Sequence, residues 1–110
     1  MTVHQQLDVA LRRLEATMKA SNLWRMPRPA PEASESREPF CVDTMSLPEW
    51  LRFVFIARLD ALVDAQAPLP ASCSVAPAAE LYLKQTDIRA SDLLLMVKAI
   101  EEVDRVVTEG

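Results

Sequence analysis

The chain has 110 residues, of which 50% are hydrophobic and 25% charged, and its formal net charge is −4 at pH 7. This size and composition are typical of one globular domain with a single core, and we expect residues 1–110 to form it. The acidic balance and the lack of any run of four or more Lys and Arg residues argue against direct binding to nucleic acid, because binders of phosphate backbones carry a basic excess or stripe.

Gly110, the last residue, is the only glycine. Loops that cradle phosphates need glycine, because it lets backbone amides approach the anion closely. The sequence therefore excludes a P-loop and a dinucleotide-binding fingerprint. Tight β-hairpins also favour glycine and are not expected, and helix ends must place Asn, Gln or ordinary residues in the left-handed position.

His4 is the only histidine, which excludes a histidine-based triad and a metal site with several histidines. We interpret it as a solvated residue in a first helical turn. Cys41 and Cys73 lack the CxxC or HxxH spacing that would support a zinc site. We interpret them as inert, small apolar side chains, and the alternative is a redox pair. The early segment is amphipathic and charged, unlike a secretory leader, and no apolar run is long enough to span a membrane. We therefore expect a cytoplasmic protein with reduced thiols, no metal and no cofactor.

Residues 2–22 are predicted to form the first helix. Apolar residues recur there at helical spacing, at Val3, Leu7, Ala10, Leu11, Leu14 and Met18. Thr2 is a suitable N-cap. On the polar side, Asp8 and Glu15 each precede a basic residue by four positions, which stabilises a helix.

The next segment, residues 25–45, has a different composition. Three prolines alternate with other residues, at Pro27, Pro29 and Pro31. Their alternation forbids helix and favours extended polyproline geometry, and a polar stretch without period follows. Three apolar residues are suited to hold the second half in place, Phe40, Val42 and Met45. We expect a loop that is loose in its first half and packed in its second.

The second helix is predicted from Ser46 or Leu47 to Ala65 or Gln66. Ser46 and Glu49 form a capping-box pattern, and Pro48 fits a first turn. The residues that follow are apolar on nearly every side. Such a helix lies at the centre of a bundle or has a second partner surface.

Two further helices follow a proline-containing connector. A short one is predicted over residues 75–84, with Ser74 as cap and Pro77 in its first turn. The last runs from Asp87 or Ile88 to Val107. The pattern as a whole predicts an all-α, four-helix bundle-like domain with a long proline-containing loop between the first two helices.

Four polar residues are of interest, Asp43, Glu49, Arg58 and Glu80. Asp43 and Glu49 bracket the start of the second helix, where carboxylates cap orphan amides. Arg58 has apolar neighbours in the same helix. A guanidinium there is expected to be partly desolvated and paired with Asp43 or Glu80. The alternative is an arginine that binds a ligand.

The sequence resembles the YqcC-like family of small bacterial proteins. The matching positions cover nearly the whole chain: Trp24-Arg25, Pro29, Pro31, Pro39-Phe40, Asp43-Thr44-Met45, Glu49-Trp50-Leu51, Ile56, Arg58, Leu69-Pro70, Val75-Ala76-Pro77 and Glu80. The resemblance implies a compact four-helix fold and brings no established activity. Genes of the family often lie beside a gene for a tRNA pseudouridine synthase. Members of the family carry a proline in place of Ala57, so the second helix of this chain should be less kinked than theirs. They also carry aromatic residues near the positions of Ala78 and Ala79 in this chain.

The leading hypothesis is a non-catalytic interaction or accessory protein that acts through residues 39–50 and is associated with that tRNA-modifying enzyme. The alternative is a small protein that binds an anionic ligand between the second and third helices, with Arg58 and Glu80 as polar groups. Trp24 and Trp50 either close the core or anchor an interface. We expect the partner to be another protein, and we expect no direct binding to nucleic acid or to a membrane. Formation of a homodimer is an open alternative. The candidate binding residues are Trp24, Phe40, Asp43, Trp50, Arg58 and Glu80.

Overall fold

The computed structural model describes residues 1–110 and consists of helices and connecting segments, without strands. Four helical bodies are present: α1 (Val3–Ala20), a continuous rod made of α2 (Leu47–Trp50), η3 (Leu51–Ile56) and α3 (Ala57–Ala65), then α4 (Ala76–Leu83) and α5 (Ala90–Glu109). This confirms the predicted all-α, four-helix architecture. The observed bounds differ from the predicted ones by up to three residues.

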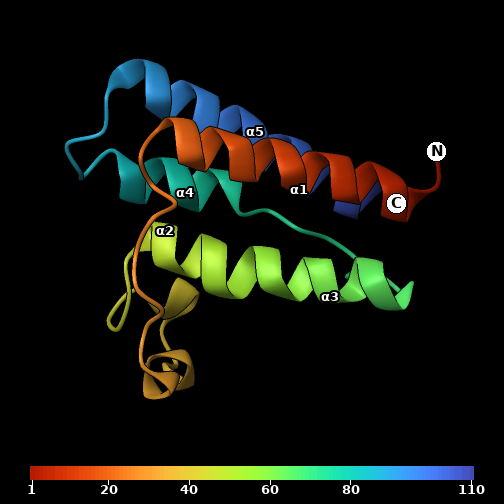
Figure 1. Ribbon diagram of the computed structural model, residues 1–110, viewed down its shortest axis with the longest axis horizontal. Coiled ribbons are helices and arrows are strands. Elements are labelled where there is room, and N and C mark those ends of the chain that lie inside the picture. Colours follow the sequence, from red (N-terminus) through yellow and green to blue (C-terminus); the bar gives the residue numbers. More distant parts are fainter.

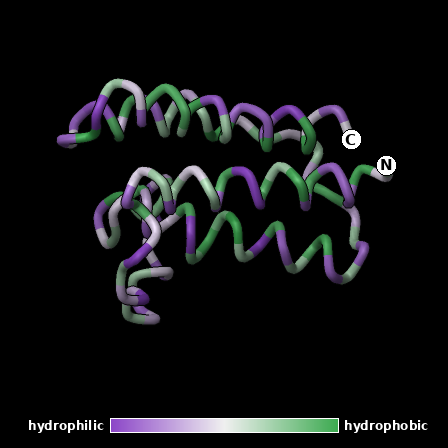
Figure 2. The backbone as a smooth tube through the Cα atoms, turned by 45° about the horizontal axis from the view of Figure 1, so that its top comes forward, coloured by the Kyte–Doolittle hydropathy of each residue, from purple (hydrophilic) through white to green (hydrophobic).

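The helices pack around one shared core. Figure 1 shows α1 and α5 side by side and running in opposite directions, so that both chain ends lie at the same end of the molecule. The rod runs along the other side of α1, and α4 packs against α5. Figure 2 shows hydrophobic and hydrophilic positions alternating along α1, α5 and the rod. None of the helices combines the length and the hydropathy that crossing a bilayer requires.

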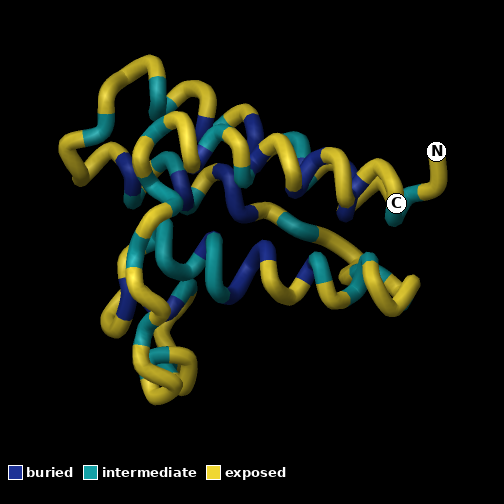
Figure 3. The backbone as a smooth tube through the Cα atoms, in the orientation of Figure 1, coloured by how far each residue is buried: buried dark blue, intermediate teal, exposed yellow.

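The core is entirely apolar. All 22 buried residues are hydrophobic, and 19 of them form one cluster that draws on α1, the rod, α4 and α5. Leu7, Leu11 and Leu14 of α1 are fully buried, as are Met96 and Ile100 of α5. Figure 3 shows these buried positions along the inner sides of the helices. No charged side chain is buried, so the fold does not depend on an internal ion pair.

The ends of the helices replace glycine as expected. Asn22 (φ 61°) and Gln66 (φ 51°) occupy the left-handed position after α1 and after α3. In the first case the amide of Leu23 donates to the carbonyl of Met18 (2.7 Å), the long bond of a Schellman motif. At the helix starts, Thr2 with Gln5 and Ser46 with Glu49 form capping boxes, which confirms Ser46 and Glu49 in the predicted roles.

The start of α4 is capped by a residue distant in sequence. The prediction of Ser74 as its cap is wrong, because the carboxylate of Asp104 in α5 accepts hydrogen bonds from the amides of Val75 (3.0 Å) and Ala76 (2.8 Å). A carboxylate accepts two amides at once and favours the positive end of the helix dipole, which a single serine hydroxyl does less well. Asp104 thereby fixes α4 to α5.

The long connection between α1 and the rod is partly helical. Residues 25–30, with Pro27 and Pro29, are not helical, in line with the expectation. A 3₁₀ turn, η1 (Pro31–Glu35), occurs at the third proline and in the polar stretch after it, where no helical structure was expected, and a second turn, η2 (Pro39–Cys41), follows. Proline is tolerated at the first position of a turn, where its missing amide would be unsatisfied in any case. The residues of η1 are not buried, whereas Cys41 and Met45 are. In Figure 3 the segment below the rod is largely exposed.

The rod has a π-helical stretch, η3, which the sequence pattern did not predict. Residues five apart in a π-helix lie near one another, because its hydrogen bonds run from i to i+5. Trp50 and Phe55 accordingly stack with ring centroids 5.4 Å apart and planes inclined by 20°. In an α-helix, the neighbours on one face are three and four apart. Ala57 then continues the helix with φ −60° and ψ −43°.

Limited trypsin digestion tests the contrast between the two halves of the connection. Arg37 is exposed and lies between η1 and η2, so we expect the earliest cut after Arg37. Mass spectrometry of the first fragments identifies the site. A first cut at Arg52 or Arg58, within the rod, would contradict this assignment of local stability.

Candidate functional site

A small apolar pocket lies between the second half of the connection and the end of α4. Its volume is about 260 Å³, and no charged residue lines it. The lining residues come from residues 40–48 and 82–86, namely Phe40, Val42, Met45, Ser46, Leu47, Pro48, Tyr82, Leu83, Gln85 and Thr86. Val42 is 45% exposed and lies at the rim of this pocket.

A chain of aromatic contacts links the pocket to the core. Phe40 meets Trp50 edge to face with centroids 4.9 Å apart, and Trp50 in turn stacks on Phe55 of the core. The ring of Tyr82 in α4 also meets Phe40 edge to face, with centroids 6.2 Å apart. Aromatic pairs in these geometries contribute about 0.5–1.5 kcal/mol each beyond burial of their area. The rings therefore join the pocket to the core as one packed unit.

The backbone of η2 is strained where it forms the pocket. Phe40 (φ 57°) and Cys41 (φ 50°) are successive non-glycine residues in the left-handed region. Each such residue costs about 1–3 kcal/mol and persists where the surroundings hold it. In this turn Cys41 is buried in a small cluster with Met45 and Val54, and Phe40 packs on Trp50. Strain of this kind gathers at sites of function.

Polar side chains fasten the two halves of the connection to each other. Asp43 accepts a hydrogen bond from the hydroxyl of Ser36, and Thr44 donates to the carbonyl of Ala33 (2.6 Å). Asp43 is exposed and does not cap the rod, contrary to one of its predicted roles. It holds residues 36 and 43 together and so helps to position the wall of the pocket.

The expectation for Arg58 is wrong. Arg58 is exposed on α3 and forms no ion pair, while Glu80 pairs with Lys84 (3.0 Å). The apolar neighbours of Arg58 in the sequence point to the core, and Arg58 itself points outward. The hollow beside Glu80 lies between α4 and α5, includes three further carboxylates and is not lined by Arg58. Because its carboxylates outnumber its one arginine, this hollow repels an anion and does not bind one.

Trp24 lies in a different group of side chains. Its ring is half-buried against the core and has the guanidinium of Arg52 over it at 4.3 Å. Arg52 also donates a hydrogen bond to the carbonyl of Trp24. Sequence reasoning missed Arg52, the half-buried cation of the rod. Its position beside Phe53, in a helix that contacts the segment of Trp24, is the only signal that could have indicated it.

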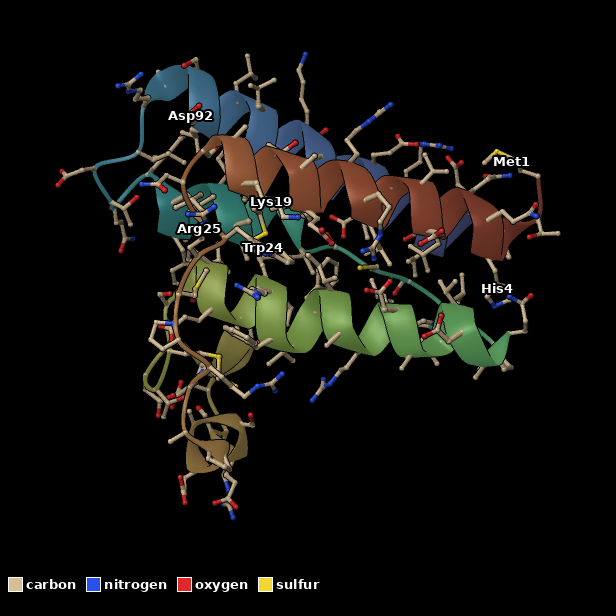
Figure 4. The ribbon with its side chains drawn as sticks, viewed as in Figure 1. Met1, His4, Lys19, Trp24, Arg25 and Asp92 are labelled. Carbon is tan, nitrogen blue, oxygen red and sulfur yellow. The ribbon has the colours of Figure 1, made fainter.

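The nucleophile candidates are held in structural roles. The Cys73 thiol donates to Asp104 (3.0 Å). Burial, with a further contribution from that hydrogen bond, raises the pKa of Cys73 to about 12. A thiol with so high a pKa is a poor nucleophile. His4, labelled in Figure 4, donates from Nε2 to the carbonyl of Ala67 (2.7 Å), so it joins α1 to the end of α3 and is not merely solvated. No group of three or more His, Cys, Asp or Glu side chains is placed to hold a metal ion.

The chain matches known proteins over most of its length. The DUF446 family model, described as tRNA pseudouridine synthase C, matches residues 6–103. An uncharacterised protein of Haemophilus influenzae is 41% identical over 101 residues, covering 92% of this chain and 94% of that protein. The uncharacterised protein YqcC of Escherichia coli is 40% identical over 83 residues, 76% of each chain.

A solved structure and a longer protein complete the comparison. The solution NMR structure of Escherichia coli YqcC has a TM-score of 0.82 and 33% identity, covering 99% of this chain and 91% of that one. The tRNA pseudouridine synthase C of Pectobacterium carotovorum is 39% identical over 72 residues, which are 66% of this chain and 19% of that protein. Most of that protein therefore lies outside the matched segment.

Truncation of Trp50 tests the aromatic support of the pocket. Trp50→Ala removes the contacts with both Phe40 and Phe55, so we expect it to lower the free energy of unfolding by about 3 kcal/mol. For a domain near this size that lowers Tm by more than about 10 °C. Trp50→Phe is the control and should retain most of the stability. A fully stable Trp50→Ala variant would show that the ring does not hold the pocket.

Alkylation of Cys73 tests its raised pKa. Between pH 9 and about 12 the native thiol keeps its proton while an unfolded chain, with the ordinary pKa of 9.0, loses it. The native state then binds more protons, so the stability that this thiol contributes is complete below pH 9 and is lost as the pH rises toward 12. We expect iodoacetamide to modify Cys73 at pH 9 far more slowly in the native protein than in urea, as measured by mass spectrometry. Equal rates would contradict the assignment.

Proposed function

Because the chain belongs to the DUF446 family of YqcC-like proteins, we propose that residues 1–110 act as one non-catalytic accessory domain that docks on a tRNA-modifying enzyme of the pseudouridine synthase type. The docking site in this proposal is the apolar pocket between residues 40–48 and the end of α4. The enzyme performs the chemistry, and this chain binds to it.

The observation that carries the proposal is the arrangement of the Pectobacterium protein. A segment similar to this chain makes up 19% of a protein named tRNA pseudouridine synthase C. Two parts of one polypeptide stay close to each other at a high effective concentration. A separate chain with the same fold would need a docking surface to achieve the same proximity, and the pocket supplies a candidate.

The chemistry of the pocket favours a protein side chain over a small ligand. Its volume of about 260 Å³ is smaller than that of typical ligand sites, which are about 300–1,000 Å³. It contains no charged residue with which to orient a metabolite. An apolar side chain of a partner fits such a cavity, in the way that aromatic or aliphatic anchors fill pockets at protein interfaces.

Charge substitution at the rim of the pocket tests the proposal. Val42 is 45% exposed, so Val42→Glu should leave the fold intact and place a carboxylate where the partner side chain enters. We expect it to weaken binding to the pseudouridine synthase C of the same organism by at least about tenfold, equal to 1.4 kcal/mol. Surface plasmon resonance with purified proteins measures the affinity.

Val9→Glu is the matched control, because Val9 is 50% exposed on α1 and does not line the pocket. It makes the same chemical change and should bind the synthase as the unmodified chain does. No measurable binding of the unmodified chain, or equal loss for both variants, would refute docking through the pocket.

A further inference from the structure

Four basic side chains gather where the chain leaves α1. They come from three separate segments: Lys19 from the last turn of α1, Arg25 and Arg28 from the connection, and Arg52 from η3. Figure 4 shows Lys19, Trp24 and Arg25 beside one another at this point. Lys19, Asn22, Trp24 and Arg25 line an open hollow of about 350 Å³. We call the four basic residues with Trp24 and Phe53 the basic face.

Two aromatic rings contact three of the four cations of the basic face, Lys19, Arg28 and Arg52. The ammonium of Lys19 lies 5.4 Å, and the guanidinium of Arg52 4.3 Å, from the centroid of Trp24. Phe53 likewise has the guanidinium groups of Arg52 (4.9 Å) and Arg28 (5.1 Å) over it. Stacking on an aromatic ring satisfies the face of a guanidinium and leaves its N–H groups able to bind a planar or tetrahedral anion, although one N–H group of Arg52 already donates to the carbonyl of Trp24.

The arginines of the basic face have no carboxylate partner within the chain. Arg25, Arg28 and Arg52 form no ion pair, whereas Arg12 and Arg105 each pair with two or more carboxylates. The acid at the edge of the face is Glu15, which pairs with Lys19 (2.8 Å). The hydrogen bond from Lys19, with the nearby charges of Arg12 and Arg52, holds the pKa of Glu15 below its usual value.

We propose that the basic face binds the phosphate backbone of RNA, and, resting on the proposed function, that this RNA is the tRNA substrate of the docked synthase. Stacked arginines without internal acids are suited to bidentate hydrogen bonds with phosphate oxygens. Both Lys19 and Arg52 lie over Trp24, so the ring supports cations rather than stacking on a base. The contact is therefore to the backbone and tolerant of base sequence.

The hollow of the basic face and the apolar pocket share no lining residue. Trp50 supports the pocket and Arg52 belongs to the basic face, and residues two apart on a helix do not face the same way. The docking site proposed above therefore does not use the residues of the basic face. Contact with nucleic acid was not expected from the sequence, because no basic residues cluster along the chain, whereas folding brings these four together from positions 19 to 52.

Reversal of the two exposed arginines tests the basic face. Arg25→Glu with Arg28→Glu changes the local charge without touching the core, and circular dichroism checks that the variant folds. Fluorescence anisotropy measures binding of a labelled tRNA transcript to the complex of chain and synthase, and to the chain alone, at several KCl concentrations. We expect the variant to bind tRNA at least about tenfold more weakly, with a salt slope smaller by about 1–2.

Arg89→Glu with Lys98→Glu is the matched control, because both residues are exposed, unpaired and placed at α5. It makes the same change of net charge and should bind tRNA as the unmodified protein does. Similar loss in both variants would indicate an effect of net charge alone and would overturn the assignment of the face.

The outcomes separate this inference from the proposed function. If the complex forms but the Arg25→Glu, Arg28→Glu variant binds tRNA normally, the inference is wrong and the docking proposal stands. If that variant loses the synthase instead, or if the chain binds polyglutamate as tightly as tRNA, the basic face is a site for acidic protein and the inference is wrong. If the chain and the synthase do not associate, the docking proposal fails. In that case, weaker tRNA binding by the isolated Arg25→Glu, Arg28→Glu variant than by the isolated unmodified chain still supports an RNA-binding face. No tRNA binding by the isolated unmodified chain refutes that face.

Discussion

The contacts of Trp50 with Phe40 and Phe55 join the irregular part of the molecule to its core. Phe55 belongs to the main cluster, Trp50 stacks on it, and Phe40 meets Trp50 from the connection. The i to i+5 spacing of the two helical rings requires the wide π-helical turn of η3. Because Phe40 is held there, the strained backbone at residues 40 and 41 persists and the pocket beside α4 keeps its shape.

Much of this fold follows from short-range features of the sequence. Apolar spacing of three and four residues located α1 and α5, and the N-cap residue Thr2 and the capping-box pattern at Ser46 marked two helix starts within a residue. The lack of internal glycine correctly indicated that residues such as Asn and Gln would take left-handed conformations at helix ends, as Asn22 and Gln66 do. Each of these signals depends on residues within a few positions of one another, which is why the sequence alone reveals them.

The features that sequence reasoning missed depend on residues far apart in the chain. Asp104 caps α4 across about 30 positions, and Arg52 reaches the carbonyl of Trp24 across 28. Arg58 was expected to be desolvated because its sequence neighbours are apolar, but rotation along a helix places adjacent residues on different sides. The wide turn of η3 left no local mark in the sequence, since the side chains it stacks are common in ordinary apolar helices.

The molecule thus offers two surfaces of opposite chemistry on one rod, an uncharged apolar pocket and a basic face, in a chain whose net charge is −4. No charged residue lines the pocket, and the raised pKa of Cys73 keeps its thiol protonated. The partners that we propose are an enzyme and the RNA that it modifies.

An NMR titration of the ¹⁵N-labelled chain with unlabelled synthase tests the docking site most directly. If the synthase docks at the pocket, amide signals will shift or broaden mainly at residues 40–48 and 82–86, while those of residues 19–28 will change only when tRNA is added afterwards. Changes confined to the outer faces of α1 and α5, or no change at saturating synthase, would contradict the assignment of the pocket as the docking site.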